Sequence, residues 1–381
     1  MQTAYLDNSA TTRVCAPAAE RALYMMTQCY GNPSSLHSLG AEAFRELETS
    51  RRAVARLIGA RPEELTFTSG GTEANNLAVL GAAASRRREG RRVVTTAMEH
   101  ASVAAACDEL ERQGFEVIRL APGRGGLVDA DQVERACDSG TVLVSVMLVN
   151  NETGAVMPIE KMAKLTHRQC PAALFHTDAV QGLFKVPFQA KTLGADLISV
   201  SGHKIHAIKG SGALYIRPGL TLPPLLLGGG QEQNYRSGTE ALPAIAALGA
   251  ACAAAYPTRM ADLRHQAALR DTLRQKIAQL PGWQLLGAAE APQIISCALP
   301  GVPSQNIINL LQDHGCYVSA GSACSKGHRS HVLQACGLPP AVIDSSIRIS
   351  LSRFTTEAEA AQLLAAMQAA TAYFKAHEKR R

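Results

Sequence analysis

The sequence predicts an α/β fold in which a mostly parallel sheet is covered by helices on both faces. The first observation is that short apolar runs alternate with helical patterns over about the first 240 residues. The second is that these apolar runs are nearly continuous, as in strands buried on both faces. The third is that a chain of 381 residues with 46% hydrophobic content is long enough for one large α/β domain or two domains.

The predicted elements follow one another in strand–helix order. A helix at 36–58 comes first, and a strand at 65–69 then runs into two glycines and a further helix. A strand that enters a helix through glycine points backbone N–H groups and the positive helix end at an anion. That further helix is predicted at 73–84. The other predicted strands are 93–97, 115–120, 142–149, 173–176, 197–200 and 213–216, and the other predicted helices are 102–113, 129–138 and 159–168.

The character of the sequence changes near residue 240, after a Pro-Pro pair and three consecutive glycines. We therefore predict an N-terminal segment, 1–15, that packs with a small domain, a large domain, 16–240, and a small α+β domain, 241–381. The small domain is expected to contain helices at 244–256, 260–279 and 305–314 and strands at 293–298, 317–319 and 346–350. Thr356 and Glu359 form a capping box for a long final helix.

The composition excludes several classes of protein. A formal charge of +6 is too small for this length to indicate nucleic-acid binding. The N-terminus lacks the features of a signal peptide, and no apolar run is long enough to cross a membrane. The ten cysteines show neither C-x-x-C pairs nor the spacing of metal ligands, which favours reduced thiols. We expect a cytoplasmic protein without a metal site, a membrane partner or a direct nucleic-acid partner.

The strand at 197–200 ends at Ser201, His203 and Lys204, which places these side chains at the mouth of the sheet. Open α/β sheets bind ligands outside the carboxyl ends of their strands. A lysine in that position can form a Schiff base with an aldehyde cofactor while its neighbours bind the cofactor's phosphate. The alternative is an ordinary solvated lysine, and this segment alone does not distinguish between the two.

Other strand ends carry residues that suit one aldehyde-bearing pyridinium cofactor. Asp178 can pair with the ring nitrogen, and His100 can stack on the ring. Taken singly, Asp178 is explained as an N-cap, His100 as a half-buried histidine and Asn151 as a turn residue. One ligand explains them together, with Gly71, Thr72, Ser201 and His203 as donors to the phosphate and with Asn151 and Gln181 as hydrogen-bonding partners of the ring oxygen.

The chain resembles the cysteine desulfurases of the NifS/IscS group, within the class V aminotransferases that use pyridoxal 5′-phosphate (PLP). The matching stretches span nearly the whole chain in family order. They are YLDNSATT, GNPSSLH, TFTSGGTEANN, Met98-Glu99-His100, VNNETG, HTDAVQG, SGHK, RSGTE, SAGSACS and IRISLSRFTT. The resemblance implies the PLP fold type I and a homodimer whose active site lies near the subunit interface.

The resemblance also implies a role for each matching residue. Lys204 matches the Schiff-base lysine and His100 the stacking histidine, and both are expected to be catalytic. Arg348 matches the arginine that binds the substrate carboxylate, a role that suits its planar fork, although a surface ion pair is the alternative. Asn151 is expected to contact both substrate and ring. Gly71, Thr72, Ser201, Gly202 and His203 match the phosphate side, Asp178 and Gln181 match ring contacts, and Thr239 matches a phosphate contact donated by the partner subunit.

Cys324 is the candidate sulfur acceptor. Small residues surround it, and three basic residues follow closely at 326, 328 and 329, which favours the thiolate. The resemblance makes this position the nucleophile that becomes a persulfide. Cys316 and Cys336 lie in more apolar surroundings and are expected to be structural.

The predicted reaction converts L-cysteine to L-alanine and leaves the sulfur on Cys324 for transfer to an acceptor protein such as an iron–sulfur scaffold. The end product, whether an iron–sulfur cluster, a thio-cofactor or thiolated tRNA, stays open, as does a preference for selenocysteine. Two departures from the family are that Ala207-Ile208 replaces the usual Gly-Pro and that the loop after Cys324 is about two residues shorter, which reduces its reach. The alternatives are a selenocysteine lyase or aminotransferase of the same class, and a non-catalytic sulfur-assembly scaffold.

Overall fold

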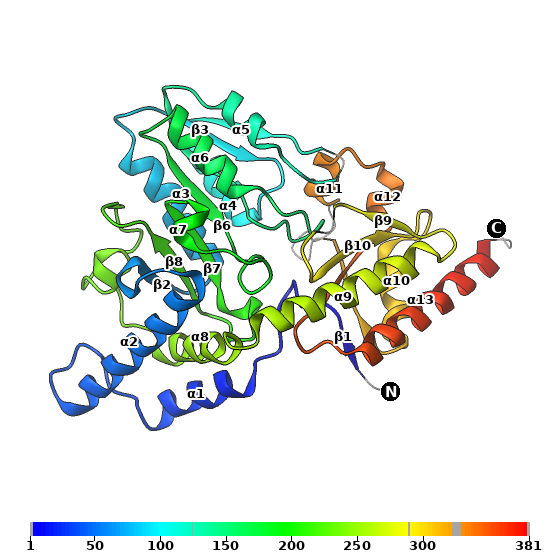
Figure 1. Cartoon of the computed structure of the whole chain (residues 1–381), viewed down its shortest axis with the longest axis horizontal. Coiled ribbons are helices and arrows are strands. Elements are labelled where there is room, and N and C mark those ends of the chain that lie inside the picture. Colours follow the sequence, from blue (N-terminus) through cyan, green and yellow to red (C-terminus); the bar gives the residue numbers. More distant parts are fainter. Residues whose placement is uncertain (1–2, 124, 289, 322–328, 379–381) are drawn as a thin grey trace.

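A computed structural model describes residues 3–123, 125–288, 290–321 and 329–378. Its largest sheet has seven strands in the order β2-β8-β7-β6-β5-β3-β4 (Figure 1). The strand β8 is antiparallel to both of its neighbours, and the other pairs are parallel. The bounds are β2 Leu65–Thr68, β3 Arg92–Thr96, β4 Glu116–Leu120, β5 Thr141–Ser145, β6 Leu174–Asp178, β7 Leu197–Ser201 and β8 Gly212–Ile216.

Helices cover both faces of this sheet, so the predicted fold class is confirmed. Alternate residues of each strand point to opposite faces. Val93 and Leu143 therefore pack with α3 (Gly71–Ser85) and α4 (Ala101–Arg112). Val94 and Val144 belong to a second core, which includes the buried residues of α5 (Ala130–Ala136), α6 (Ile159–Gln169), α7 (Ala190–Leu193), α1 (Ala16–Thr27), α2 (Ser38–Ile58) and α8 (Leu242–Ala255).

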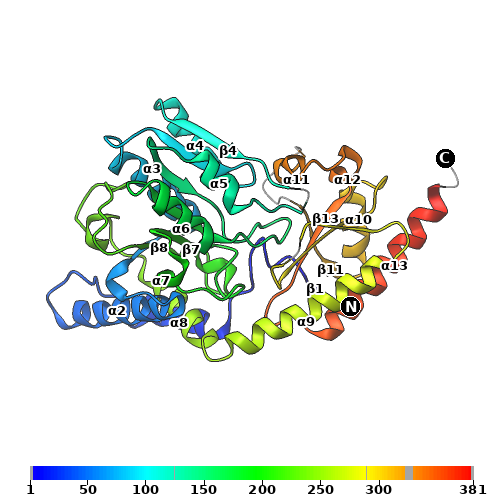
Figure 2. The same ribbon diagram turned by 45° about the horizontal axis from the view of Figure 1, so that its top comes forward.

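The C-terminal part has its own core around an antiparallel sheet, in the order β12-β13-β10-β9. In Figure 2 this part lies at the opposite end of the molecule from α1 and α2. The capping box at Thr356 and Glu359 is present, with Thr356 N–H 2.7 Å from Glu359 Oε2. The elements are β9 Gln284–Leu286, β10 Ile294–Ala298, β12 Ser319–Ala320, β13 Ser346–Ser350, α9 Arg259–Ala278, α10 Ser304–Asp313, α11 His331–Ala335, α12 Pro340–Asp344 and α13 Glu357–Glu378.

The N-terminal segment crosses between the two parts of the chain. Its strand β1 (Ala4–Tyr5) pairs in parallel with β11 (Cys316–Tyr317), so its first residues belong to the C-terminal core. In contrast, α8 packs against α1 and α2. The buried residues of α8 therefore belong to the core of the large sheet, and those of α9 to the C-terminal core. The domain limits themselves stay a prediction.

Several elements differ from the sequence prediction, which contained no counterpart of α7, α11, α12 or β9. The helix α1 was not predicted, because its buried face consists of small or weakly patterned residues such as Ala18, Ala22 and Met25. The strand predicted at 142–149 ends at Ser145, although the following apolar residues stay buried and hydrogen-bond to the end of β6. In the described ranges, no helix combines the length and the hydropathy that crossing a membrane requires.

Candidate active site

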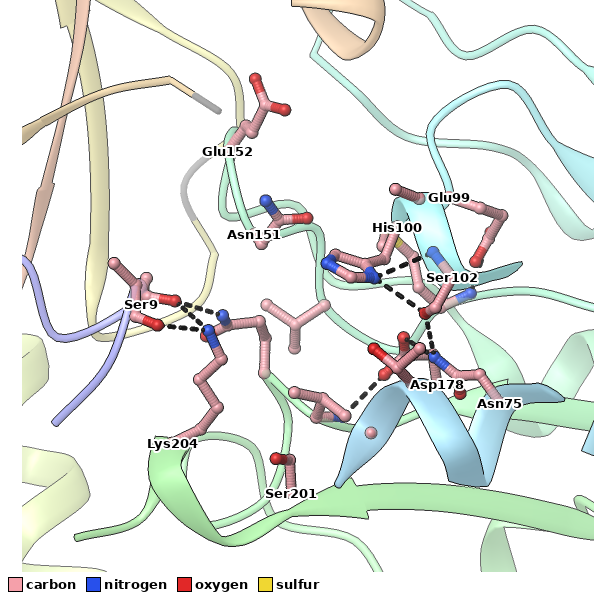
Figure 3. A pocket seen from close by; sticks show the side chains of 18 of the residues that line it. Ser9, Asn75, Glu99, His100, Ser102, Asn151, Glu152, Asp178, Ser201 and Lys204 are labelled. Carbon is pink, nitrogen blue, oxygen red and sulfur yellow. Dashed lines mark hydrogen bonds between the residues drawn. The ribbon is translucent and has the colours of Figure 1, made fainter. Parts of the chain in front are cut away.

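One cavity of about 480 Å³ opens at the carboxyl ends of β6 and β7, where the N-terminal segment and the C-terminal part meet the large sheet (Figure 3). Its volume lies in the usual range for small-molecule sites. Ten of the predicted site residues line it: Gly71, Thr72, His100, Asn151, Asp178, Gln181, Ser201, His203, Lys204 and Arg348.

Lys204 follows β7 in a single 3₁₀ turn, Gly202–Lys204, that turns its side chain into the cavity. Its Nζ donates to the main-chain oxygens of Ser9 and Ala10, at 2.6 and 2.8 Å. Both acceptors lie in the N-terminal segment, so a segment far away in sequence fixes the position of the amine. Lys204 is therefore not the solvated surface lysine that was the alternative.

Ser201 lies beside the first turn of α3, and His203 lines the same cavity. The buried Ser201 Oγ has no hydrogen-bond partner within the described part of the chain, although buried hydroxyls normally have one. At Gly71, a Cβ would lie 2.7 Å from Val180 Cγ2, so this close approach of the helix start requires glycine. Burial, with a further effect from Lys204, lowers the pKa of His203 to about 4, which leaves the imidazole neutral near pH 7. This end of the cavity can donate hydrogen bonds to an anion.

A chain of polar groups runs from Asp178 to His100. Asp178 Oδ1 accepts from Val180 N–H at 2.9 Å, and its Oδ2 accepts from Asn75 Nδ2 at 2.7 Å. The same Asn75 Nδ2 lies 2.9 Å from Ser102 Oγ, which lies 2.8 Å from His100 Nδ1. The carboxylate is thus held at the cavity wall, where it can face a cationic ring nitrogen.

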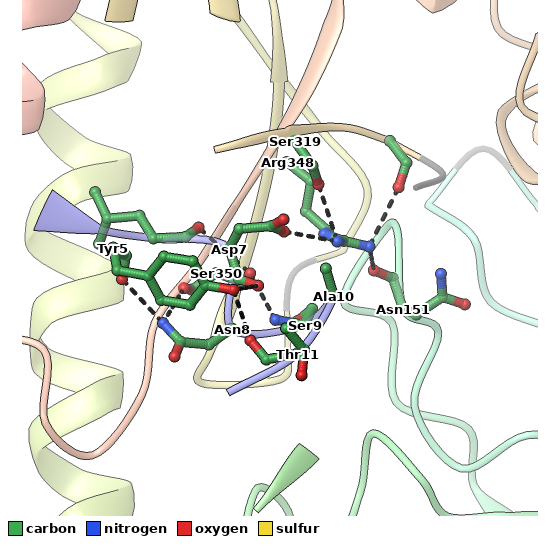
Figure 4. A network of polar contacts seen from close by, with 12 residues as sticks. Tyr5, Asp7, Asn8, Ser9, Ala10, Thr11, Asn151, Ser319, Arg348 and Ser350 are labelled. Carbon is green, nitrogen blue, oxygen red and sulfur yellow. Dashed lines mark hydrogen bonds and ion pairs between the residues drawn. The ribbon is translucent and has the colours of Figure 1, made fainter. Parts of the chain in front are cut away.

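Arg348 crosses from β13 to the cavity and is only 2% exposed (Figure 4). Its Nη2 lies 3.0 Å from Asp7 Oδ1 and 2.9 Å from Ser319 Oγ. Its Nη1 donates to the main-chain oxygens of Asn151 and Gly321, at 2.9 and 3.2 Å. The alternative of a surface ion pair is wrong, because this guanidinium is buried in a network that joins both parts of the chain.

The remaining predicted residues have other positions. Gly202 is buried beside the cavity but does not line it, and Thr239 is exposed and lies outside the lining. Gln181 lines the cavity while its Nε2 donates to Ser9 O at 2.9 Å. Cys324 lies outside the described residues. Cys316 and Cys336 are buried, as expected, and burial raises the pKa of each thiol to about 11.

Sequence reasoning missed several lining residues, among them Asn75, Ser102 and His331. A signal for Asn75 existed, because it is a polar residue on the buried face of α3, one helical turn after Gly71. Glu99 was quoted only as part of a motif. It is buried at the cavity wall, and this burial raises the pKa of its carboxyl group to about 8.

The comparisons with known proteins agree with this geometry. The model of the family "Aminotransferase class-V" matches residues 4–363. The chain belongs to the class-V aminotransferase family. Within this class-V family, it is 42% identical over 372 residues to "Cysteine desulfurase 2" of Trichormus variabilis, covering 96% of this chain and 92% of the relative. It is 38% identical over 364 residues to "Cysteine desulfurase IscS" of Methanosarcina thermophila, with 94% and 90% covered.

Solved structures of this class-V type share the fold. A "NifS-like protein" superposes with a TM-score of 0.92 at 34% identity, covering 98% of this chain and all of that one. A structure described as "SspA in complex with cysteine" superposes with a TM-score of 0.79 at 32% identity, covering 93% of this chain and all of that one. The predicted family and enzyme class, that of the PLP-dependent cysteine desulfurases, are therefore confirmed.

Proposed function

We propose that this chain is a PLP-dependent cysteine desulfurase that converts L-cysteine to L-alanine, holds the released sulfur on Cys324 as a persulfide and passes it to an acceptor. The observation that carries the proposal is the meeting of Lys204 and Asp178 in one cavity, beside a buried Ser201 Oγ that has no hydrogen-bond partner among the described residues. The relatives named cysteine desulfurases support the same activity.

The residues present fit PLP. Lys204 would hold its aldehyde carbon, and the carboxylate of Asp178 would face its ring nitrogen. The unpartnered Ser201 Oγ and the start of α3 at Gly71 and Thr72 would donate to its phosphate. Gly202 and His203 would complete the phosphate side, Asn151 and Gln181 would contact the ring oxygen, and His100 would stack on the ring. When bound, PLP supplies an electron sink for the charge that develops on the substrate carbon.

Arg348 is proposed to bind the substrate carboxylate, with Asn151 as a second contact. Its planar fork lines the cavity and is oriented by Asp7 and by two main-chain oxygens. Its buried Nε has no partner in the described ranges, so a hydrogen bond to a ligand would not displace one at that nitrogen. A structural relative described as a complex with cysteine supports an amino acid substrate of this size.

Proton movement is assigned to Lys204. Its Nζ lies inside the cavity beside two carbonyl oxygens, and a lysine amine in this setting can take a proton from the substrate carbon. The thiolate of Cys324 would then bond to the substrate sulfur as the carbon–sulfur bond breaks, so that alanine leaves without the sulfur atom.

The decisive experiment is mass spectrometry of the intact protein after incubation with L-cysteine, followed by peptide mapping. We expect one added sulfur atom, located on Cys324. Cys324→Ala should keep the yellow colour of bound PLP and lose both the added sulfur and sulfide release. Cys336→Ala, a variant of a buried thiol, is the matched control and should keep both.

The alternatives predict different results. A selenocysteine lyase or an aminotransferase of this family needs Lys204 but not Cys324, so unchanged turnover in Cys324→Ala would favour them. A non-catalytic scaffold would show no PLP absorbance at all. The acceptor is proposed to be a protein that takes the persulfide sulfur, such as an iron–sulfur scaffold, in the cytoplasm, and the active unit is proposed to be a homodimer to which Thr239 of the second copy contributes.

A further inference from the structure

The hydrogen bonds around His100 define which of its ring nitrogens carries a proton. His100 is the N-cap of α4, and its Nδ1 accepts from the main-chain N–H of Ser102 at 3.2 Å. A backbone N–H can only donate. Nδ1 must therefore offer a lone pair, and the proton of a neutral His100 lies on Nε2.

The hydrogen bonds that run from Asp178 through Asn75 and Ser102 to His100 assign the same tautomer. Asp178 Oδ2 can only accept from Asn75 Nδ2, because an ionised carboxylate carries no proton. Turning the Asn75 amide over would bring its oxygen against this carboxylate, so the orientation is fixed. The second proton of Asn75 Nδ2 is donated to Ser102 Oγ, which leaves the Ser102 hydroxyl proton for His100 Nδ1 at 2.8 Å.

We propose that Asn75 and Ser102 are positioning residues that hold His100 as its neutral Nε2–H tautomer, so that the ring offers the bound substrate a hydrogen-bond donor instead of a base. The opposite nitrogen points into the cavity, away from Ser102 (Figure 3). The tautomer is independent of the reaction, and only its catalytic meaning rests on the proposed function.

The surroundings also oppose a second proton on this ring. A protonated Nδ1 would bring its N–H against the N–H of Ser102, two donors face to face. Burial lowers the pKa of His100. Among the groups that face it from other elements, Lys204 and His331 also lower this pKa, while Asp178 raises it. His203 lies near enough to interact as well. The ligand-free site therefore favours a neutral His100 that presents its Nε2–H to the cavity.

The direct test is ¹⁵N NMR of protein labelled in histidine, free of PLP and of substrate, with His100→Gln to assign the signal. We expect a protonated Nε2 and an unprotonated Nδ1 for His100 at pH 7. Ser102→Ala keeps the backbone N–H but removes the hydroxyl that donates to Nδ1, so the other tautomer should gain population or the titration should move upward. Ser102→Thr, which keeps the hydroxyl, should restore the wild-type spectrum. A protonated Nδ1 in the wild-type protein overturns the proposal.

A second Ser–His pair supplies a matched control. Ser145 Oγ lies 2.8 Å from Nδ1 of His176 in the middle of the sheet, and neither residue lines the cavity. Ser145→Ala should change the His176 signal and leave that of His100 unchanged. If Ser145→Ala changes the His100 signal as much as Ser102→Ala does, the effect comes from a non-specific loss of packing in the large sheet, and the positioning role is wrong.

Kinetics separate this inference from the proposed function. Losing one neutral hydrogen bond that orients His100 should lower kcat roughly three- to tenfold and leave PLP binding intact. Ser102→Thr should recover most of the loss. A wild-type protein without desulfurase activity but with the expected His100 signal would refute the proposed function and keep the tautomer. An active desulfurase with a protonated Nδ1 would support the proposed function and refute the tautomer.

Discussion

Replacing Lys185 with methionine is expected to stabilise the protein at neutral pH. Lys185 is 6% exposed, and among the described residues its side chain makes no hydrogen bond or ion pair. It lines a small second cavity with Arg353, His206, Gln266 and Asp262, close to the seam between the two parts of the chain. The carboxylate of Asp262 lies 3.8 Å from Arg353 and makes no ion pair with Lys185. A buried ammonium without a carboxylate partner opposes folding, because it has lost its hydration without compensation.

The magnitude follows from the pKa of this lysine. Burial, with the charges of Lys204 and Arg353, lowers the pKa of Lys185 from 10.5 to about 8. One pH unit corresponds to about 1.36 kcal/mol, so the folded state loses about 3 kcal/mol by carrying this group below pH 8. Between pH 8 and 10.5 the unfolded chain binds more protons than the folded protein, so stability rises with pH in this window.

The assay is urea unfolding of Lys185→Met and wild type at pH 7 and pH 10, each without PLP. We expect a gain of up to about 3 kcal/mol at pH 7 that shrinks toward zero by pH 10, since methionine has a similar size and no charge. Lys191→Met, at an exposed lysine of α7, is the control and should change stability by less than about 0.5 kcal/mol. A loss of stability in Lys185→Met at pH 7, or an equal gain at both pH values, would refute the reasoning.

Three further outcomes are expected. Glu232→Ala should cost about 3–5 kcal/mol in urea unfolding, because Glu232 pairs with the buried Arg51 at 2.6 Å and accepts from Phe67 N–H, and Arg51 keeps only the partly exposed Glu48 as a carboxylate partner among the described residues; a cost below about 1 kcal/mol would contradict this. Arg348→Lys should raise the KM for L-cysteine roughly tenfold or more with PLP still bound, because lysine lacks the planar fork, and an unchanged KM argues against carboxylate binding there. Although burial of Asp196 opposes ionisation, hydrogen bonds from His167 and from Phe175 N–H together lower its pKa, so its contribution to stability is present above the ordinary aspartate pKa and is lost as pH falls through the folded value. As the pH is lowered from 5 to 2, melting temperatures should therefore fall less steeply in Asp196→Asn than in wild type, and parallel curves would exclude this role.

Much of the fold could be predicted from the sequence because the strands of the large sheet, apart from the edge strand β4, are buried on both faces. Such strands appear as short apolar runs, and the seven predicted in the first part correspond to the seven of the large sheet. The helix α1 could not be found in this way. Its buried alanines carry little hydrophobic signal, and its position depends on α8, which follows more than 200 residues later in the chain.

The candidate site was predictable where its residues end strands. Asp178, Ser201 and Lys204 follow β6 and β7 directly, so the periodicity that predicts the strands also locates the side chains. Asn75 was signalled only as a polar residue on the buried face of α3, and its contacts with Ser102 and Asp178 could not be predicted, because those partners come from other elements. Local sequence carries no information about such a contact.

The sequence by itself determined the kind of sheet, the residues at its carboxyl edge and the resemblance to cysteine desulfurases, since each depends on side-chain order along the chain. Only the tertiary structure decided that the amine of Lys204 is held by Ser9 and Ala10 and that Arg348 is buried beside Asp7. It also decided that Ser102 orients His100. The physical reason is that hydrogen bonds act over about 3 Å, and which groups come that close is set by the packing of whole elements.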